Sequence, residues 1–129
     1  MDPEEKNHFE EIEKEQKIIN RGLVRFRKRG KEKVKSFLDF YRDSQKGPSL
    51  PNKFRELIRL CIVVEEGCKP CILKHLKLCF DAGCSEEEIV DAMIVLLSMK
   101  GGMVYEYIGF LMASVKYIKE KKEVQDAGE

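Results

Sequence analysis

The sequence predicts an all-α fold, a single-domain helical bundle of about six helices. Three observations lead to this prediction. Apolar residues recur at three- and four-residue spacing along most of the chain, glycine or proline stands at the breaks, and no alternating strand pattern of useful length competes. The 129 residues support one domain, because two independent cores would each lie near the limit of small-domain stability.

The first third of the chain predicts two charged helices. Apolar residues from Phe9 to Phe26 follow helical spacing within residues 3–29, and Gly30 is expected to break the helix before a shorter one over residues 34–41. A turn rich in Gly, Pro and Ser follows. Residues 1–46 are therefore predicted to form a charged N-terminal helical extension.

Four more helices are expected in the predicted domain, residues 47–122. The first begins near Pro51 or Lys53 and ends before Gly67, and the second opens at residues 68–70 and ends at Gly83.

The remaining two helices have equally clear limits. Ser85 and Glu88 form a capping box that starts one helix, and Gly101–Gly102 ends it. The last helix is expected over residues 104–118. The charged stretch after it is expected to fray, with residues 123–129 as a frayed tail.

Composition excludes several classes of protein. Lys and Arg number 24 against 23 Asp and Glu, and 43% hydrophobic residues exclude disorder over the whole length. No apolar run reaches the roughly 18–20 residues of a membrane-spanning helix, and the acidic start does not resemble a secretion signal. We expect a cytoplasmic protein with no membrane partner. Its spare apolar faces favour a homo-oligomer, in which the long first helix can serve as an arm.

Residues 21–35 form a basic run with eight Lys or Arg against the single acid Glu32. Such a run can follow the phosphates of a nucleic acid. A solvated face that meets the acidic segment Glu4–Glu15, in the same chain or a neighbouring subunit, is favoured instead. Nucleic acid is thus the less favoured partner.

Cysteine usage is the informative feature of the sequence. Five cysteines fall within 24 consecutive positions, an odd number that does not suggest a disulfide framework. They are Cys61, Cys68, Cys71, Cys79 and Cys84. In a cytoplasmic chain, this cluster favours metal binding or thiol chemistry.

Cys68 and Cys71 form a C-x-x-C pair at the predicted start of a helix, where free N–H groups and the helix dipole favour a thiolate. His75 lies one turn after Cys71, so its imidazole can exchange a proton with that thiol directly or through one water. Glu56 places a carboxylate on the same face as Leu60. A carboxylate on a buried face needs a partner, for which a histidine on the next helix and an ion pair with Arg or Lys both remain open.

A structural zinc site is the alternative use of these residues. Cys68, Cys71, His75 and Cys79 are candidate ligands, but helix rise places Cys71 and Cys79 about 12 Å apart, too far for one ion. Cys84 leaves the alternative open, because it can complete a site from the following turn. If no zinc is bound, we expect Cys61 and Cys79 to lie in the core and Cys84 to be exposed. His8 is expected to be solvated.

The spacing of Glu56, Cys68, Cys71 and His75 resembles the signature of the alkyl hydroperoxidase D-like, or carboxymuconolactone decarboxylase-like, family over residues 50–115. The resemblance implies an all-helical fold, a trimer or hexamer, and a peroxiredoxin-like (alkyl hydroperoxide reductase type) enzyme. It implies that Cys71 is the peroxidatic thiolate, that Cys68 resolves it as a disulfide, and that Glu56 and His75 form a proton relay. Cys79 and Cys84 lie outside the family pattern.

The function expected from this resemblance is that of a thiol-dependent peroxidase or disulfide oxidoreductase. Its partners would be a small hydroperoxide and a lipoyl- or thioredoxin-like dithiol donor, with no cofactor and no bound metal. Two alternatives remain: a non-enzymatic zinc- or nucleic-acid-binding helical module, and a decarboxylase-like activity that does not need the cysteines.

Overall fold

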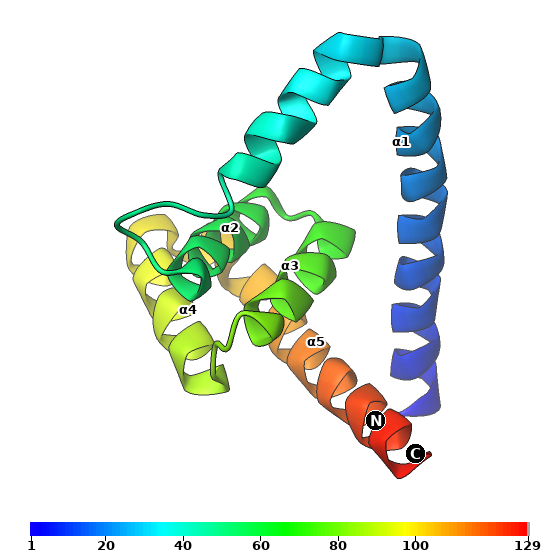
Figure 1. The fold of residues 1–129 in the computed structure, drawn as a ribbon. Helices are drawn as coiled ribbons and strands as arrows, with labels where there is room; N and C mark the ends of the chain where they lie inside the picture. The colour runs from blue at the N-terminus through cyan, green and yellow to red at the C-terminus, as the bar shows by residue number, and fades with distance from the viewer. Residues whose placement is uncertain (129) are drawn as a thin grey trace.

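The computed structural model describes residues 1–128 and contains helices and no strand among them, which confirms the all-α prediction (Figure 1). The helices are α1 (Pro3–Asp43), α2 (Asn52–Glu66), α3 (Lys69–Asp81), α4 (Glu86–Lys100) and α5 (Gly102–Ala127). None of them is both long and apolar enough to cross a membrane. The predicted limits of α2, α3 and α4 agree with the observed ones to within two residues.

The core lies between α2, α3, α4 and α5, which pack on one another as a bundle. Each helix contributes its apolar stripe, so the side chains at the centre are fully enclosed. The largest of them are Leu60, Ile72, Leu76, Ile89 and Leu111. The bundle gives the α2–α3 turn a rigid base.

Two of the turns in the bundle have the same construction. α2 ends at Gly67, whose φ of 71° is left-handed, and the N–H of Cys68 donates to the carbonyl of Val63. α3 ends in the same way, with Gly83 at φ 91° and the N–H of Cys84 donating to the carbonyl of Cys79. These are Schellman motifs, in which the residue after the glycine contacts the helix it has just left.

α1 is bent into two rods. Lys31 has a non-helical φ of 51° and ψ of −128°, one residue after the predicted break at Gly30. The first rod runs beside the end of α5, and the second returns from the elbow to α2 (Figure 1). Counting the two rods separately gives the six helices expected from the sequence.

The first rod of α1 docks on α3 and α5 through a small second core. Phe9 and Ile12 are buried there with Leu73 and Tyr117, and the rings of Phe9 and Tyr117 stack at 4.7 Å. Glu13 adds ionic contacts beside them, with its carboxylate 2.7 Å from Nζ of Lys77. This contact brings the N-terminal rod against the helix that carries Cys71.

The expected frayed end is helical in the structure. α5 continues to Ala127, beyond the end predicted near residue 118, and only residue 129 lies outside the described residues. Two contacts with the other end of the chain accompany this extension. The N-terminal amine lies 3.0 Å from the carboxylate of Glu120, and Lys121 Nζ lies 2.8 Å from that of Glu13.

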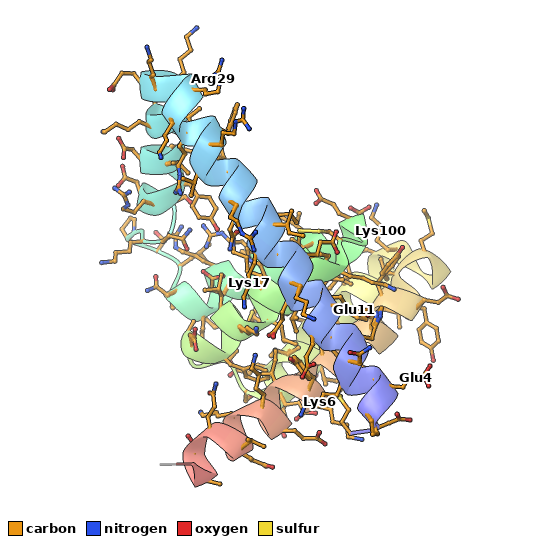
Figure 2. The ribbon with its side chains drawn as sticks, turned by 90° about the vertical axis from the view of Figure 1, so that its right-hand side faces the viewer. Glu4, Lys6, Glu11, Lys17, Arg29 and Lys100 are labelled. Atoms are coloured by element: carbon orange, nitrogen blue, oxygen red, sulfur yellow. A yellow bond between two sulfur atoms is a disulfide. The ribbon has the colours of Figure 1, made fainter. Side chains whose placement is uncertain are left out.

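The basic run of residues 21–35 lies around the elbow of α1, where nearly all its side chains are exposed (Figure 2). Among residues 1–128, no ion pair joins this run to the acidic segment Glu4–Glu15. Glu13 pairs with Lys77 and Lys121 instead, and Lys35 pairs with Asp39. Pairing within one chain, one of the options open from sequence, is therefore not observed in the described residues.

Candidate functional site

The α2–α3 turn places both cysteines of the C-x-x-C pair at the start of α3. Gly67 and Cys68 complete the Schellman motif of α2, and Cys68 is also the N-cap residue of α3. Cys71 follows in the first turn of α3. The two cysteines form a disulfide with their Cα atoms 5.2 Å apart, and both side chains are partly exposed.

The start of α3 favours a thiolate. The first N–H groups of a helix lack intrahelical partners, and the positive end of the helix dipole lies there. The first turn of α3 contains no acidic residue that would repel a thiolate, and the side chain of the N-cap residue Cys68 makes no capping hydrogen bond. Pro70 fits the first turn, because its missing N–H is not needed there. Once the disulfide is reduced, this position suits an acidic thiol.

His75 lies one turn after Cys71 on α3 and is half-buried. Burial, together with repulsion from Lys74 and Arg59, lowers the pKa of His75 below that of an exposed histidine. Its Nδ1 is buried with no hydrogen-bond partner among the described residues. At neutral pH the ring is therefore a neutral imidazole that is able to accept a proton.

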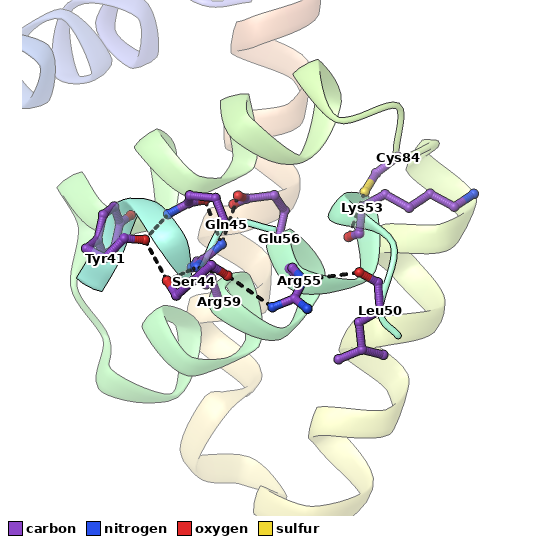
Figure 3. A network of polar contacts seen from close by, with 9 residues as sticks. All are labelled: Tyr41, Ser44, Gln45, Leu50, Lys53, Arg55, Glu56, Arg59 and Cys84. Atoms are coloured by element: carbon purple, nitrogen blue, oxygen red, sulfur yellow. Dashed lines mark hydrogen bonds and ion pairs between the residues drawn. The ribbon is translucent and has the colours of Figure 1, made fainter. Parts of the chain in front are cut away.

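Glu56 is buried on α2, as its place on an apolar stripe predicts, and only 8% of the residue is exposed. Its Oε1 accepts a hydrogen bond from Nη1 of Arg59 at 3.1 Å, one turn further along α2 (Figure 3). Oε2 is buried and has no partner among residues 1–128. Of the two partners left open from sequence, the structure gives Glu56 an arginine.

No hydrogen bond joins Glu56 to His75 in the described residues. Both are buried or half-buried side chains on the packed pair α2 and α3, and each keeps one enclosed polar atom without a partner. Buried polar atoms usually have partners, whereas each of these two atoms remains free to accept or exchange a proton.

The other three cysteines are free thiols that lie in or against the core. Cys79 and Cys84 are buried and Cys61 is half-buried against the core. Burial raises the pKa of all three thiols, so the thiolate is scarce. The expectation of an exposed Cys84 is wrong, because this residue follows the Schellman glycine of α3 and packs into the core, where its thiol donates to the carbonyl of Lys53.

The described residues contain no group of three or more His, Cys, Asp or Glu side chains placed to hold a metal ion. Cys68 and Cys71, the first two candidate zinc ligands, are joined in the disulfide. The donor set that the zinc alternative needs is therefore not assembled in this part of the chain.

Arg59 is the residue that sequence reasoning missed at this site. Its side chain is only 18% exposed and reaches the carboxylate of Glu56. Their spacing of three residues is a helical ion-pair spacing, and this signal was sufficient to suggest the contact.

Comparison with known proteins identifies the family of the chain. The model of the carboxymuconolactone decarboxylase family matches residues 33–107, more than half of the chain. The match begins inside the segment assigned above to the N-terminal extension, in the second rod of α1. No curated protein matches the sequence significantly.

Solved structures of the same family share the fold. A carboxymuconolactone decarboxylase family protein from Legionella pneumophila superposes with a TM-score of 0.71 at 23% identity, over 85% of this chain and 96% of its own. A carboxymuconolactone decarboxylase family protein from Thermotoga maritima, described as possibly involved in the antioxidative response, superposes with a TM-score of 0.66 at 29% identity. The match covers 86% of this chain and 92% of the Thermotoga chain. A second structure from Thermotoga maritima superposes with a TM-score of 0.67 at 25% identity, over 91% of this chain and 97% of its own. The chain belongs to the carboxymuconolactone decarboxylase family.

Proposed function

We propose that the protein is a thiol-dependent peroxidase of the disulfide oxidoreductase class, which reduces hydroperoxides at the expense of an external dithiol. The observation that carries the proposal is the Cys68–Cys71 disulfide at the start of α3, one turn before His75. The Thermotoga relative described in connection with an antioxidative response supports the same chemistry.

Cys71 is the attacking thiol in this mechanism. Its thiolate attacks the terminal oxygen of the hydroperoxide, the O–O bond breaks, and the alcohol leaves after taking up a proton. Cys71 is thereby oxidised to a sulfenic acid. The helix start on which Cys71 lies stabilises the thiolate before attack.

Cys68 then resolves the sulfenic acid. Its sulfur attacks the sulfur of Cys71, water leaves, and the disulfide forms, as found in the structure. A lipoyl- or thioredoxin-like dithiol reduces this disulfide by two exchange steps, in which the donor becomes a disulfide and both cysteines return to thiols. The partly exposed position of the pair gives the donor access.

His75 and Glu56 manage the protons. His75 is the base for the Cys71 thiol, and its lowered pKa keeps the imidazole neutral and ready to accept a proton. The free Oε2 of Glu56 supplies a second acceptor on the neighbouring helix. Because protonation of His75 removes the base, peroxide reduction should persist to a pH below the usual histidine value before it falls.

The working form is proposed to be a homo-oligomer, a trimer or a hexamer. An apolar stripe on α2 and another on α4 remain exposed in the single chain, a pattern typical of interfaces. Their exposed residues are Phe54, Ile58, Ile62, Ile94, Val95 and Met99. A reducing compartment such as the cytoplasm suits the three free thiols.

The test is dithiol-dependent consumption of cumene hydroperoxide, with dihydrolipoamide as the donor. We expect turnover by the native chain, none by Cys71→Ser, and much slower turnover by Cys68→Ser, whose sulfenic acid must react with the donor directly. Cys61→Ala is the matched control, since Cys61 lies outside the pair and has a raised pKa.

Two results would count against the proposal. Unchanged turnover in Cys71→Ser would show that this thiol does not react with peroxide. Decarboxylation or lactone chemistry that survives loss of both Cys68 and Cys71 would instead assign the protein to the activity after which the family is named.

A further inference from the structure

The side chain of Arg59 joins the redox site to the end of α1. On one side, its Nη1 donates to Oε1 of Glu56 at 3.1 Å. On the other, the same guanidinium donates to Oε1 of Gln45 at 2.9 Å and to Oγ and the carbonyl of Ser44 at 2.9 and 3.3 Å (Figure 3). Its plane also lies 5.5 Å from the ring of Tyr41. Residues 41–45, named the α1–α2 junction here, therefore hold one side of this arginine.

The contact with Glu56 is enclosed. The side chains of Glu56 and Arg59 are 10% and 18% exposed, so the carboxylate depends on this guanidinium for its compensating charge. Because Oε1 is tied down, the carboxylate cannot rotate freely, and the direction of the unpartnered Oε2 is set. The junction thus determines where the free oxygen of Glu56 points.

The same guanidinium also acts on His75. Burial is the largest cause of the lowered pKa of His75, and repulsion from Lys74 and then from Arg59 adds to it. Lys74 lies on α3 and Arg59 and Glu56 lie on α2. No charged group of α1, α4 or α5 in the described residues shifts this pKa. One arginine therefore contacts the carboxylate and biases the imidazole of the proposed relay.

We infer that Arg59 is a positioning residue of the redox site, which orients the carboxylate of Glu56 and carries its positive charge near His75 while the α1–α2 junction holds the guanidinium in place. The inference rests on the proposed function and adds a residue and a segment to it. Arg59 does not touch the reacting sulfurs. It acts through Glu56 and His75.

Arg55 provides a matched control one turn earlier on α2. Its Nη1 donates to the carbonyl of Ser44 at 3.0 Å and its Nε to the carbonyl of Leu50 at 3.1 Å, so it supports the same junction. No hydrogen bond or ion pair joins it to Glu56 among residues 1–128. Loss of Arg55 weakens the junction and leaves the relay charges unchanged.

The experiment compares Arg59→Gln, Arg59→Lys and Arg55→Gln, each in two measurements. The first is the pH profile of the rate at which the reduced protein consumes cumene hydroperoxide. We expect Arg59→Gln to lower this rate about tenfold or more at neutral pH, because the acceptor is no longer held in position. Arg59→Lys should recover part of the rate, since it keeps the charge and loses the planar fork. Arg55→Gln should stay within about twofold of the native rate.

The second measurement does not need peroxidase activity. The titration of His75 is followed by NMR in a His8→Gln background, which leaves one histidine. Arg59→Gln should move the midpoint to higher pH, whereas Arg59→Lys and Arg55→Gln should leave it near the native value. If the native chain consumes no peroxide, the proposed function fails, and this titration still tests the inference.

Two results would overturn the inference. One is a His75 midpoint that Arg59→Gln does not move. The other is an active native chain in which Arg55→Gln loses as much rate as Arg59→Gln, because the arginines would then serve only to hold the junction.

Discussion

Glu13 should hold the first rod of α1 against α3 by charge, and Glu13→Gln tests this directly. Its carboxylate lies 2.7 Å from Nζ of Lys77 and 2.8 Å from Nζ of Lys121, and it accepts a hydrogen bond from the Tyr117 hydroxyl at 3.1 Å. Burial alone would raise the pKa of Glu13. The hydrogen bonds and charges of the two lysines outweigh it and hold the pKa at about 2, against an ordinary value of 4.5.

The size of the effect follows from this difference. Before solvent screening is included, the difference between a pKa of 4.5 and one of about 2 corresponds to about 3.4 kcal/mol of folding free energy. The two lysine side chains are 41% and 43% exposed, so solvent screening reduces the expected contribution to about 1 kcal/mol. For a chain of this size, Glu13→Gln should then lower Tm by about 3–5 °C at pH 7.

The sign of the pH dependence separates charge from packing. A carboxyl whose pKa is lowered on folding stabilises the protein fully above its unfolded pKa of 4.5, and this stability is lost as the pH falls towards about 2. The difference in free energy of unfolding between the native protein and Glu13→Gln, measured in urea, should therefore be smaller at pH 3 than at pH 7. Glu11→Gln, on the exposed side of the same helix, is the control. If this difference in free energy of unfolding is the same at both pH values, the charge of Glu13 does not stabilise the contact.

Three further predictions concern the turn, the arm and the interface. Gly67→Ala should cost about 1–3 kcal/mol in urea unfolding, because φ is 71° and a Cβ would lie 2.7 Å from the ring of Tyr107; unchanged stability would contradict this. Phe9→Ala removes the ring stacked on Tyr117 and should cost about 3–5 kcal/mol and raise amide exchange in the first rod of α1; native-like protection there would exclude the proposed docking. Ile58→Asp, at a side chain 49% exposed, should lower the mass measured by sedimentation while keeping the helical circular dichroism; an unchanged mass would place the interface elsewhere.

Helix limits could be predicted because they depend on local chemistry. Gly67, Gly83 and Gly101 all have positive φ and end their helices where glycine interrupts the apolar spacing. The capping box of Ser85 and Glu88 is present with both of its hydrogen bonds. Burial of Glu56 followed from helical periodicity in the same way.

Features that depend on contacts between distant residues could not be predicted. The continuation of α5 to Ala127 is accompanied by the contact of Lys121 with Glu13, more than one hundred positions away in the chain. Burial of Cys84 depends on the Schellman motif, which a capping serine beside it does not reveal. The bonds from Arg59 to Ser44 and Gln45 depend on how the α1–α2 junction folds back over α2.

The central claim is that Cys71 is the thiol that hydroperoxide oxidises. The most direct measurement mixes the reduced Cys68→Ser variant with one equivalent of cumene hydroperoxide and follows intact mass and peptide fragments over a single turnover. The account predicts the gain of one oxygen atom on Cys71, reversed by a dithiol. No gain of oxygen, or oxygen gained first on Cys61, Cys79 or Cys84, would contradict it.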